Sequence, residues 1–319
     1  MLDPLLCDFP LPHFERFYPL GFPVDVLTNS ACVLEAARQS WGQFEHTFDR
    51  RPMILRIGVI GTETGPMPGP PVYRGYRNLV SMISDSENYS ICELANGFAY
   101  AWLTEAVVRH TAFFRYFFLE ASANLLISST YLAAVHAACV EFEGQGVLLA
   151  GDSGSGKSSL AYTCARAGWT YITDDASYLM RDGDSLEVIG NPFQMRLRDT
   201  ASAVFPEFSG SDANLRPNGN SKIEVLTCTL NGVKISGRSN VQMVVFLNRN
   251  GANSPELVPF PKPEALKRWS QTICYGDADV RAAQHKAFLR LLDADVYELR
   301  YAEASTAVSY LEKFLSGEK

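Results

Sequence analysis

Residues 151–160, with the sequence GDSGSGKSSL, combine glycine, lysine and hydroxyl side chains in an order suited to binding phosphate. Gly151, Gly156, Lys157 and Ser158 match the pattern G-x-x-x-x-G-K-[ST] in full. Glycines let the backbone N–H groups of such a loop turn inward, and a helix that begins near the lysine adds its positive end. Lys157 would reach the β- and γ-phosphates of ATP, and the Ser158 hydroxyl would bind Mg²⁺. The pattern predicts a nucleotide site formed by Gly151, Asp152, Ser153, Gly154, Ser155, Gly156, Lys157, Ser158 and Ser159.

A pair of acids, Asp174 and Asp175, ends the apolar run WTYIT, and Asp174 follows Lys157 by 17 residues. This interval has room for a helix and a returning strand. Asp174 is therefore expected on a strand that neighbours the loop, with its carboxylate near the γ-phosphate. Because successive strand residues face opposite sides, the two acids should have different roles. We assign Asp174 as the base that accepts a proton from an attacking hydroxyl, and Asp175 as a metal contact. A solvated turn before a hairpin is the alternative.

Other polar residues near these motifs could belong either to the site or to the ordinary structure around it. His136, alone in an apolar strand, would be a hydrogen-bonded core residue. Lys222 follows a polar loop and could meet a phosphate when that loop closes, or could equally be a lysine at a strand edge. Arg196 and Arg198 share one face of a strand, which could bind phosphate or face solvent. An ordinary P-loop ATPase is disfavoured, because Asn248 follows the apolar strand VQMVVFL where a Walker-B acid would stand.

Strands and helices alternate through the second half of the chain, which predicts an α/β fold. The apolar run VLLAG is expected as a strand, and KSSLAYTCARAG as a helix that ends at Gly168. This strand and helix around the glycine loop favour a nucleotide site over a Gly/Ser-rich turn with a solvent lysine. A hairpin around RDGDS follows the acid pair. Residues 208–225 are expected as a polar loop that closes on substrate.

Residues 1–112 are predicted to form a smaller α+β region, and residues 113–319 the P-loop core. The first region should contain a helix in NSACVLEAARQSWGQF, capped by Asn29 or Ser30, the strand MILRIGVIG, and strands between 73 and 110. FFRYFFLEASANLLISS reads as a buried helix, since Arg115 and Glu120 would be costly in a membrane. The first region could select substrate, form a homo-oligomer contact, or simply provide a core.

Composition excludes several classes of protein. The chain has 319 residues, 47% of them apolar, and a net charge of −7 without a basic block, which argues against a nucleic-acid partner. Its seven cysteines are an odd number without a CxxC pair, so free buried thiols in a reducing cytoplasm are expected. The first residues do not resemble a signal peptide. These observations predict a cytoplasmic protein without a membrane or nucleic-acid partner.

The motifs together resemble the HPr kinase/phosphorylase family. GVLLAGDSGSGKSSLA looks like the phosphate-binding loop of that family, YITDD like its catalytic aspartate pair, and LAAVHAACVEF like the strand that carries its histidine. The resemblance covers roughly residues 130–182. It implies an α/β P-loop kinase core of the type shared with phosphoenolpyruvate carboxykinases. It also implies that Asp174 deprotonates a serine hydroxyl and that His136 tunes or holds Asp174.

One departure from that family affects the expected activity. The family's signature stretch after the hairpin is replaced here by IGNPFQMRLRDTASAVFPEF, so neither phosphorylase activity nor HPr as substrate is expected. The chain looks more like diverged kinase-like relatives that phosphorylate serine in modified peptides. The favoured function is thus transfer from ATP, with Mg²⁺, to a hydroxyl of a protein or peptide. A nucleotide-binding regulator without phosphotransfer stays open, and a carboxykinase-type small-molecule enzyme ranks third.

Overall fold

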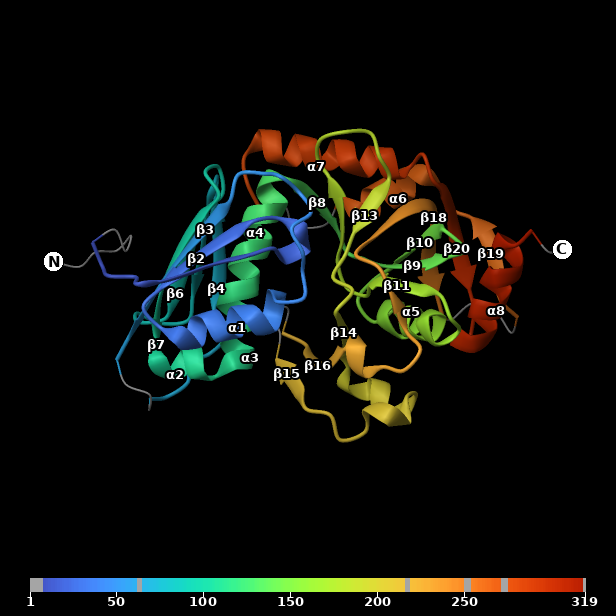
Figure 1. The fold of residues 1–319 in the computed structure, drawn as a ribbon. Helices are drawn as coiled ribbons and strands as arrows, with labels where there is room; N and C mark the ends of the chain where they lie inside the picture. The colour runs from blue at the N-terminus through green and yellow to red at the C-terminus, as the bar shows by residue number, and fades with distance from the viewer. Residues whose placement is uncertain (1–7, 62–64, 216–218, 250–253, 271–274, 318–319) are drawn as a thin grey trace. The chain divides into compact units, whose positions relative to one another are not determined.

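The computed structural model describes residues 8–61, 65–215, 219–249, 254–270 and 275–317 (Figure 1). The chain divides into two compact units. The first comprises Met1–Tyr131, Asn214–Ser221 and Cys274–Arg281, and the second comprises Leu132–Ala213, Lys222–Ile273 and Ala282–Lys319. The boundary predicted between residues 112 and 113 falls inside the helix α3 (Thr111–Phe114).

The first unit contains a seven-stranded sheet in the order β1-β2-β3-β7-β6-β5-β4. Strands β2, β3 and β7 run parallel, and the other neighbours are antiparallel. The predicted strand over residues 53–60 and the strands after residue 72 are present, whereas the two N-terminal strands were not expected. The bounds are β1 (His13–Phe17), β2 (Val24–Thr28), β3 (Met53–Ile60), β4 (Val72–Tyr76), β5 (Leu79–Ile83), β6 (Tyr89–Glu93) and β7 (Phe98–Thr104).

The helices of the first unit depart from the sequence pattern at one place. The expected helix α1 (Ala31–Trp41) begins after Ser30, whose side chain makes no capping hydrogen bond. The helix expected near residue 113 consists instead of α3, a π-helical turn η2 (Arg115–Leu119) and α4 (Glu120–Thr130). Arg115 and Glu120 in this run are buried and form an ion pair of 3.1 Å, which explains how an apolar segment accommodates two charges. The short elements α2 (Glu105–Arg109) and η1 (Pro19–Gly21) complete this unit.

None of the helices in the described ranges is both long and apolar enough to cross a membrane.

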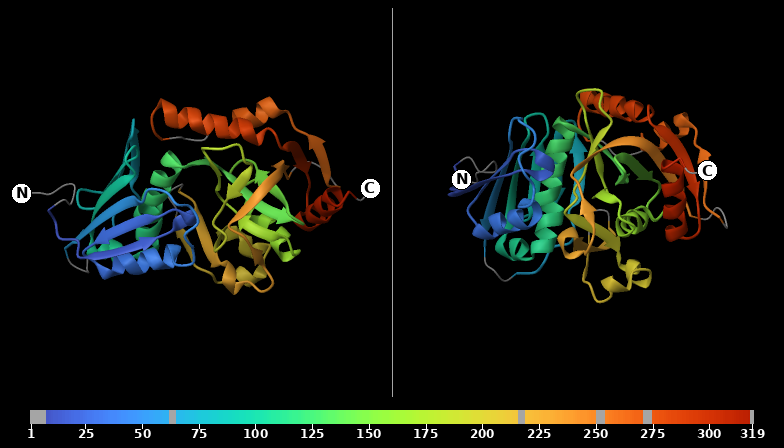
Figure 2. Two further views of the ribbon diagram at one scale, coloured as in Figure 1. Left: turned by 45° about the horizontal axis from the view of Figure 1, so that its top comes forward. Right: turned by 45° about the vertical axis from the view of Figure 1, so that its right-hand side comes forward.

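The second unit contains a ten-stranded sheet with the order β17-β11-β9-β10-β18-β13-β12-β8, to which β20 and β19 are added beside β18 (Figure 2). Strands β10, β18 and β20 run parallel, and β9 is antiparallel to both β10 and β11. The hairpin expected around RDGDS is formed by β12 and β13. The bounds are β8 (Leu132–Val135), β9 (Ala137–Phe142), β10 (Gln145–Ala150), β11 (Thr170–Thr173), β12 (Ser177–Met180), β13 (Glu187–Ile189), β17 (Lys234–Ile235), β18 (Arg238–Asn248), β19 (Glu256–Pro259) and β20 (Asp295–Arg300).

Helices cover both faces of the centre of this sheet. Alternate residues of β10 belong to two different hydrophobic clusters: Val147 and Leu149 to one, Leu148 and Ala150 to the other. The first cluster includes residues of α5 (Lys157–Arg166) and α8 (Ala304–Leu315), and the second includes residues of α6 (Lys262–Trp269) and α7 (Ala278–Leu291). Burial on both faces accounts for the nearly continuous apolar sequence of β10 and β18. The chain is therefore a mixed α/β protein with several sheets.

A smaller ribbon follows the hairpin. Strand β14 (Gln194–Arg198) pairs antiparallel with β16 (Ser221–Leu226), and β15 (Ala213–Leu215) belongs to the same sheet. The prediction of an irregular loop over residues 208–225 was therefore wrong in two places, because β15 lies inside this segment and β16 occupies its end. The 3₁₀ turns η3 (Asp199–Ala203), η4 (Pro206–Phe208) and η5 (Thr227–Thr229) flank the ribbon.

The cysteines in the described ranges are free. Cys92, Cys139 and Cys164 are buried as expected, whereas Cys32 is partly accessible and Cys228 is exposed. Cys7 and Cys274 lie outside the described residues.

Candidate active site

The glycine loop connects β10 to α5 and requires glycine at three positions. Gly151, Gly154 and Gly156 have φ angles of +146°, +93° and +99°, which side chains disfavour. A Cβ on Gly151 would lie 2.7 Å from the Ser155 hydroxyl oxygen, so any side chain there would collide with the loop. Gly156 directly precedes the first helical residue, Lys157. The loop is thus closed tightly and followed at once by the positive end of a helix.

Lys157 is only 6% exposed and folds back over the loop. Its Nζ donates hydrogen bonds of 2.7 Å and 3.0 Å to the backbone oxygens of Gly151 and Asp152. Burial lowers the pKa of this amine to about 8, and Asp175 only partly opposes the shift. A bound anion would therefore stabilise the charged form of this buried amine, as expected for a lysine that binds phosphate.

We expect nucleotide binding to take up protons between pH 8 and pH 10.5, which are about the pKa of Lys157 in the free site and the ordinary lysine value. Free Lys157 is largely uncharged in this range, and a bound triphosphate would favour its charged form. Calorimetric titration in two buffers of different ionisation enthalpy measures the uptake, which should approach about one proton per nucleotide. Lys157→Arg, whose guanidinium stays charged, should show none. Identical heats in both buffers for the unaltered protein would contradict the expectation.

The acid pair follows β11, but β11 is not next to β10 as the sequence argument required. Strand β9 lies between them and is antiparallel to both. That prediction was wrong because two parallel strands joined by a helix need not be neighbours when a third strand inserts between them. The acids nevertheless reach the start of α5, since the Ser158 hydroxyl lies 3.4 Å from the backbone oxygen of Asp174.

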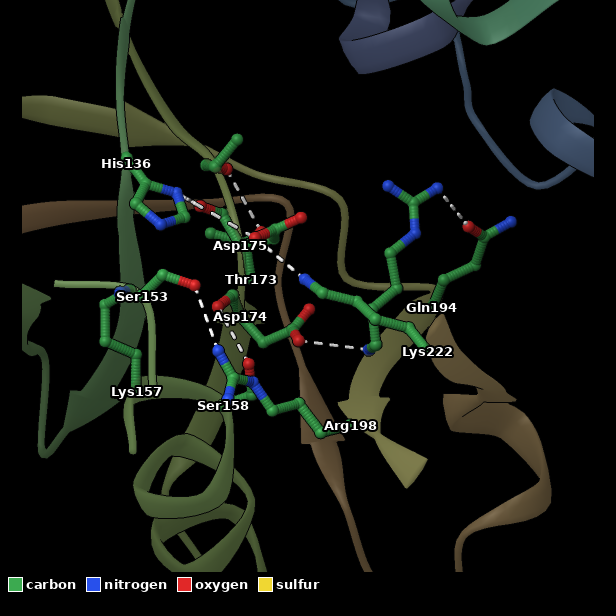
Figure 3. A network of polar contacts seen from close by, with 12 residues as sticks. His136, Ser153, Lys157, Ser158, Thr173, Asp174, Asp175, Gln194, Arg198 and Lys222 are labelled. Atoms are coloured by element: carbon green, nitrogen blue, oxygen red, sulfur yellow. Dashed lines mark hydrogen bonds and ion pairs between the residues drawn. The ribbon is translucent and has the colours of Figure 1, made fainter. Parts of the chain in front are cut away.

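The Asp174 carboxylate is enclosed, and each of its oxygens accepts one hydrogen bond. The residue is 3% exposed. One carboxylate oxygen accepts a hydrogen bond of 3.0 Å from the Tyr171 hydroxyl, and the other accepts one of 3.0 Å from the backbone N–H of Arg196. Burial, reinforced by the negative charge of Asp175, raises the pKa of Asp174. A dashed line at the Asp174 carboxylate in Figure 3 marks the second of these hydrogen bonds.

The Asp175 carboxylate has a different environment, as the assignment of different roles requires. About a third of its side chain, 32%, is exposed, and one oxygen lies 3.0 Å from Lys222 Nζ (Figure 3). Burial alone would raise the pKa of Asp175, but the positive charges of Lys222 and Arg196 outweigh it and lower the pKa. Asp175 is therefore a permanent anion at neutral pH, beside a less acidic Asp174.

His136 contacts Asp175, whereas the family resemblance implied a contact with Asp174. The histidine lies at the bend between β8 and β9, and its Nδ1 is 3.0 Å from the backbone oxygen of Asp175. Since a carbonyl oxygen only accepts hydrogen bonds, Nδ1 carries the proton and Nε2 of the neutral ring is an acceptor. Desolvation of the ring by the surrounding protein, and then the positive charge of Lys157, lower the pKa of His136. The ring is therefore neutral at neutral pH.

The basic residues of the ribbon are brought to the same site. Lys222 is buried at 8% exposure and bound to Asp175, so it is not a lysine at a solvent-exposed strand edge. Arg198 Nη2 donates a hydrogen bond of 3.0 Å to the Ser153 hydroxyl of the glycine loop. Arg196 pairs with neighbours of the ribbon, through a hydrogen bond of 3.0 Å to the Gln194 side chain and a separation of 3.9 Å from Glu224.

Two residues of this network were missed by the sequence argument. Tyr171 is fully buried, and its hydroxyl lies 3.0 Å from both an Asp174 oxygen and the backbone oxygen of Gln194. A tyrosine in an apolar strand resembles an ordinary core residue, and no spacing rule links it to the acids. Gln194 is also buried, and its partner Arg196 is two residues away on the same strand face. That i, i+2 relation was the available signal.

The loop residues fit a bound phosphate, and the oxygen donors nearby fit a hard cation. Among the described residues, the buried Ser155 hydroxyl has no hydrogen-bond partner, and the Ser158 hydroxyl makes a long contact of 3.4 Å with the backbone oxygen of Asp174. Within the described ranges, no three His, Cys, Asp or Glu residues cluster as a protein-only metal site would need. Mg²⁺ is commonly held by one or two protein oxygens together with substrate phosphates and water, which matches this sparse set.

Comparison with known proteins gave a limited result. No protein-family model matches the chain, and no curated protein sequence matches it. Among solved structures, the Hpr(Ser) kinase/phosphatase from Coxiella burnetii matches with a TM-score of 0.34 and 13% sequence identity, over 58% of this chain and 94% of that chain. A TM-score of this size does not establish a common fold, so the chemistry of the site has to be inferred from its own residues.

Proposed function

We propose that this protein is an ATP-dependent kinase that transfers the γ-phosphoryl group to a hydroxyl, most simply that of a serine in a protein or peptide. The observation that carries the proposal is the meeting of two motifs in one unit: the first turn of the helix after the glycine loop contacts the acid pair through Ser158 and Asp174. A glycine loop alone would support nucleotide binding. Acids beside it supply the proton acceptor and the metal contact that phosphoryl transfer needs.

Each group has a role suited to its environment. The loop, residues 151–159, holds the phosphates of ATP through backbone N–H groups, and Lys157 binds the β- and γ-phosphates. The Ser158 hydroxyl and the Asp175 carboxylate would hold Mg²⁺, which when bound offsets the charge of the phosphates. Lys222 keeps Asp175 ionised, and His136 holds the backbone of Asp175 through its Nδ1.

Asp174 is the proposed proton acceptor. Two neighbouring carboxyl groups with pKa values moved in opposite directions are typical of an acid–base residue beside a permanent anion. Asp174 has the raised pKa and Asp175 the lowered one. The hydroxyl oxygen of the substrate would attack the γ-phosphorus, and the bond from that phosphorus to the β-phosphate oxygen would break. The hydroxyl proton would pass to Asp174. Its oxygens hold one hydrogen bond each and keep a lone pair for this proton.

Asp175 is the competing proton acceptor, because it is the more accessible carboxylate. Asp174 is enclosed, so the residues around it would have to move when the substrate binds. The geometry of a general base often changes between the free enzyme and its substrate complex.

Transfer of ³²P from labelled ATP tests the function directly. The protein is incubated with Mg²⁺, labelled ATP and the proteins of a lysate treated to remove its own kinase activity, and the products are separated by electrophoresis. We expect a labelled band that requires the added protein and that is stable to acid and labile to alkali, as serine phosphate is. Lys157→Ala is the control and should give no band. ATP binding without any labelled product would contradict the kinase function.

A nucleotide-binding regulator without phosphotransfer is the second candidate, favoured by the enclosure of Asp174. It predicts tight nucleotide binding together with intact ATP after prolonged incubation with every acceptor tried. ATP-to-ADP turnover that a hydroxyl compound stimulates would exclude it.

A further inference from the structure

Arg198 is an exposed residue whose guanidinium reaches the glycine loop. Its Nη2 donates a hydrogen bond of 3.0 Å to the Ser153 hydroxyl. The position that a Cβ on Gly154 would occupy is 3.3 Å from both Nη1 and Nη2. The absence of a side chain at residue 154 therefore leaves room for the guanidinium on the loop surface.

The β14–β16 ribbon fixes this placement. Arg198 on β14 is directly opposite Lys222 on β16, so the two side chains share one face of the ribbon. Lys222 extends to Asp175 while Arg198 extends to the loop. The next pair along the ribbon, Leu197 and Ile223, faces the other way and is buried in the hydrophobic core. The core thus anchors a ribbon that presents one cation to the acid pair and another to the loop.

The partner that the structure gives Arg198 in the loop is neutral. A guanidinium has five N–H donors and matches the paired oxygens of phosphate, whereas a serine hydroxyl satisfies one donor and offsets no charge. Lys157 and the helix start already make this region positive. An anion bound in the loop would offset the charge that this further cation adds. A triphosphate is the anion that such a loop takes.

We propose that Arg198 binds the γ-phosphate of ATP and stabilises the charge that develops during transfer, as an arginine supplied by the same chain. This inference rests on the proposed kinase function. As the bond from the γ-phosphorus to the β-phosphate oxygen breaks and the bond to the acceptor oxygen forms, negative charge spreads over the equatorial oxygens of the phosphoryl group. Arg198 donates to those oxygens, while the hydroxyl proton goes to the aspartate.

The test compares nucleotides that differ only at the γ position. Dissociation constants for MgATP, MgADP and MgADP with aluminium fluoride, a mimic of the phosphoryl group in transfer, are measured on the full chain and on Arg198→Gln. We expect Arg198→Gln to weaken MgATP about 10–100-fold, the loss typical of a charge-assisted hydrogen bond, and the fluoride complex at least as much. MgADP affinity should change less than about threefold. Arg198→Lys keeps the charge without the paired N–H donors of the guanidinium, so its affinity for MgATP should lie between those of the unaltered protein and Arg198→Gln.

Arg238→Gln is the matched control, because Arg238 is a half-exposed arginine at the start of β18 that pairs with Glu187. It should leave all three constants unchanged, and thermal melting of Arg198→Gln should match that of the unaltered protein. Equal losses for MgATP and MgADP, or no loss for either, would overturn the role of Arg198 and leave the kinase function standing. If the unaltered protein bound neither nucleotide, the kinase function itself would fall together with this inference.

Discussion

Lys157→Met is expected to reduce phosphoryl transfer by about 10³-fold or more, since removing one preorganised donor to developing charge typically costs this much. The methionine keeps the length of the side chain and removes only the ammonium. That ammonium is buried on the loop, bonded to the carbonyl oxygens of Gly151 and Asp152, and would exchange or extend these bonds to the phosphates. The measurement is the initial rate of ³²P transfer at a saturating concentration of ATP, together with the affinity for MgATP, which should also fall.

Lys267→Met provides the comparison, because Lys267 is 71% exposed and lies 4.0 Å from Glu264 on the same helix. It should transfer phosphate at the parental rate. The role of the glycine loop would be untenable if Lys157→Met bound MgATP and transferred phosphate as well as Lys267→Met did.

Asp174→Asn is expected to lower the transfer rate by about 10²–10⁴-fold and to leave MgATP affinity nearly unchanged. Asparagine fits the existing network, because its amide oxygen can accept from the Arg196 N–H while its NH₂ group donates to the Tyr171 hydroxyl. That hydroxyl can still donate to the backbone oxygen of Gln194. The variant therefore removes proton acceptance with little change of structure. Single-turnover transfer separates this chemical step from binding.

Asp175→Asn distinguishes the two carboxylates. If Asp174 is the base, Asp175→Asn should raise the Mg²⁺ concentration that transfer requires and retain measurable transfer. A complete loss of transfer at every Mg²⁺ concentration would move the base to Asp175. The pH profile gives an independent sign. Transfer should rise with pH as Asp174 ionises, and its raised pKa places this rise above the ordinary aspartate range. Because the charge of Asp175 contributes to that shift, Asp175→Asn should move the rise to lower pH.

The central strands and the glycine loop could be predicted because their signals are local. Residues 147–150 of β10 form an apolar run, as burial on both faces requires, and the glycines of the loop occupy the backbone conformations that only glycine readily adopts. The hairpin of β12 and β13 has its turn residues between two apolar strands. In each case one short segment determines the structure without reference to distant residues.

The order of the strands and the contacts of the acids could not be predicted in this way. The place of β9 between β10 and β11 depends on pairing between segments that are far apart in the chain, and the spacing from Lys157 to Asp174 is the same with or without it. Likewise, the spacing does not indicate that His136 contacts Asp175 or that Lys222 does. The carboxylate environments, and hence the division of roles, follow from these tertiary contacts.

The π-helical turn shows a third limit of pattern reading. The run from Phe113 to Ser129 has the composition of one continuous buried helix, but the pairing of Arg115 with Glu120 spans five residues instead of four. The wider turn lets both side chains point to Ser40, whose hydroxyl bonds to each of them. A local periodicity of 3.6 residues does not anticipate this adjustment.

Strand β9 sets the positions of both halves of the site, because it pairs with β10 and with β11. Cys139 of β9 pairs with Leu148 on one side and with Thr173 on the other. The positions of the glycine loop and of the acid pair therefore both depend on the register of β9. A slip of one residue in either ladder would displace one half by about 3.3 Å, more than phosphoryl transfer tolerates. The exposed turn at Glu143 and Gly144 lies at the other end of these strands. A short peptide grafted there would lengthen the turn while preserving both registers, which makes it a suitable attachment point for a reporter dye.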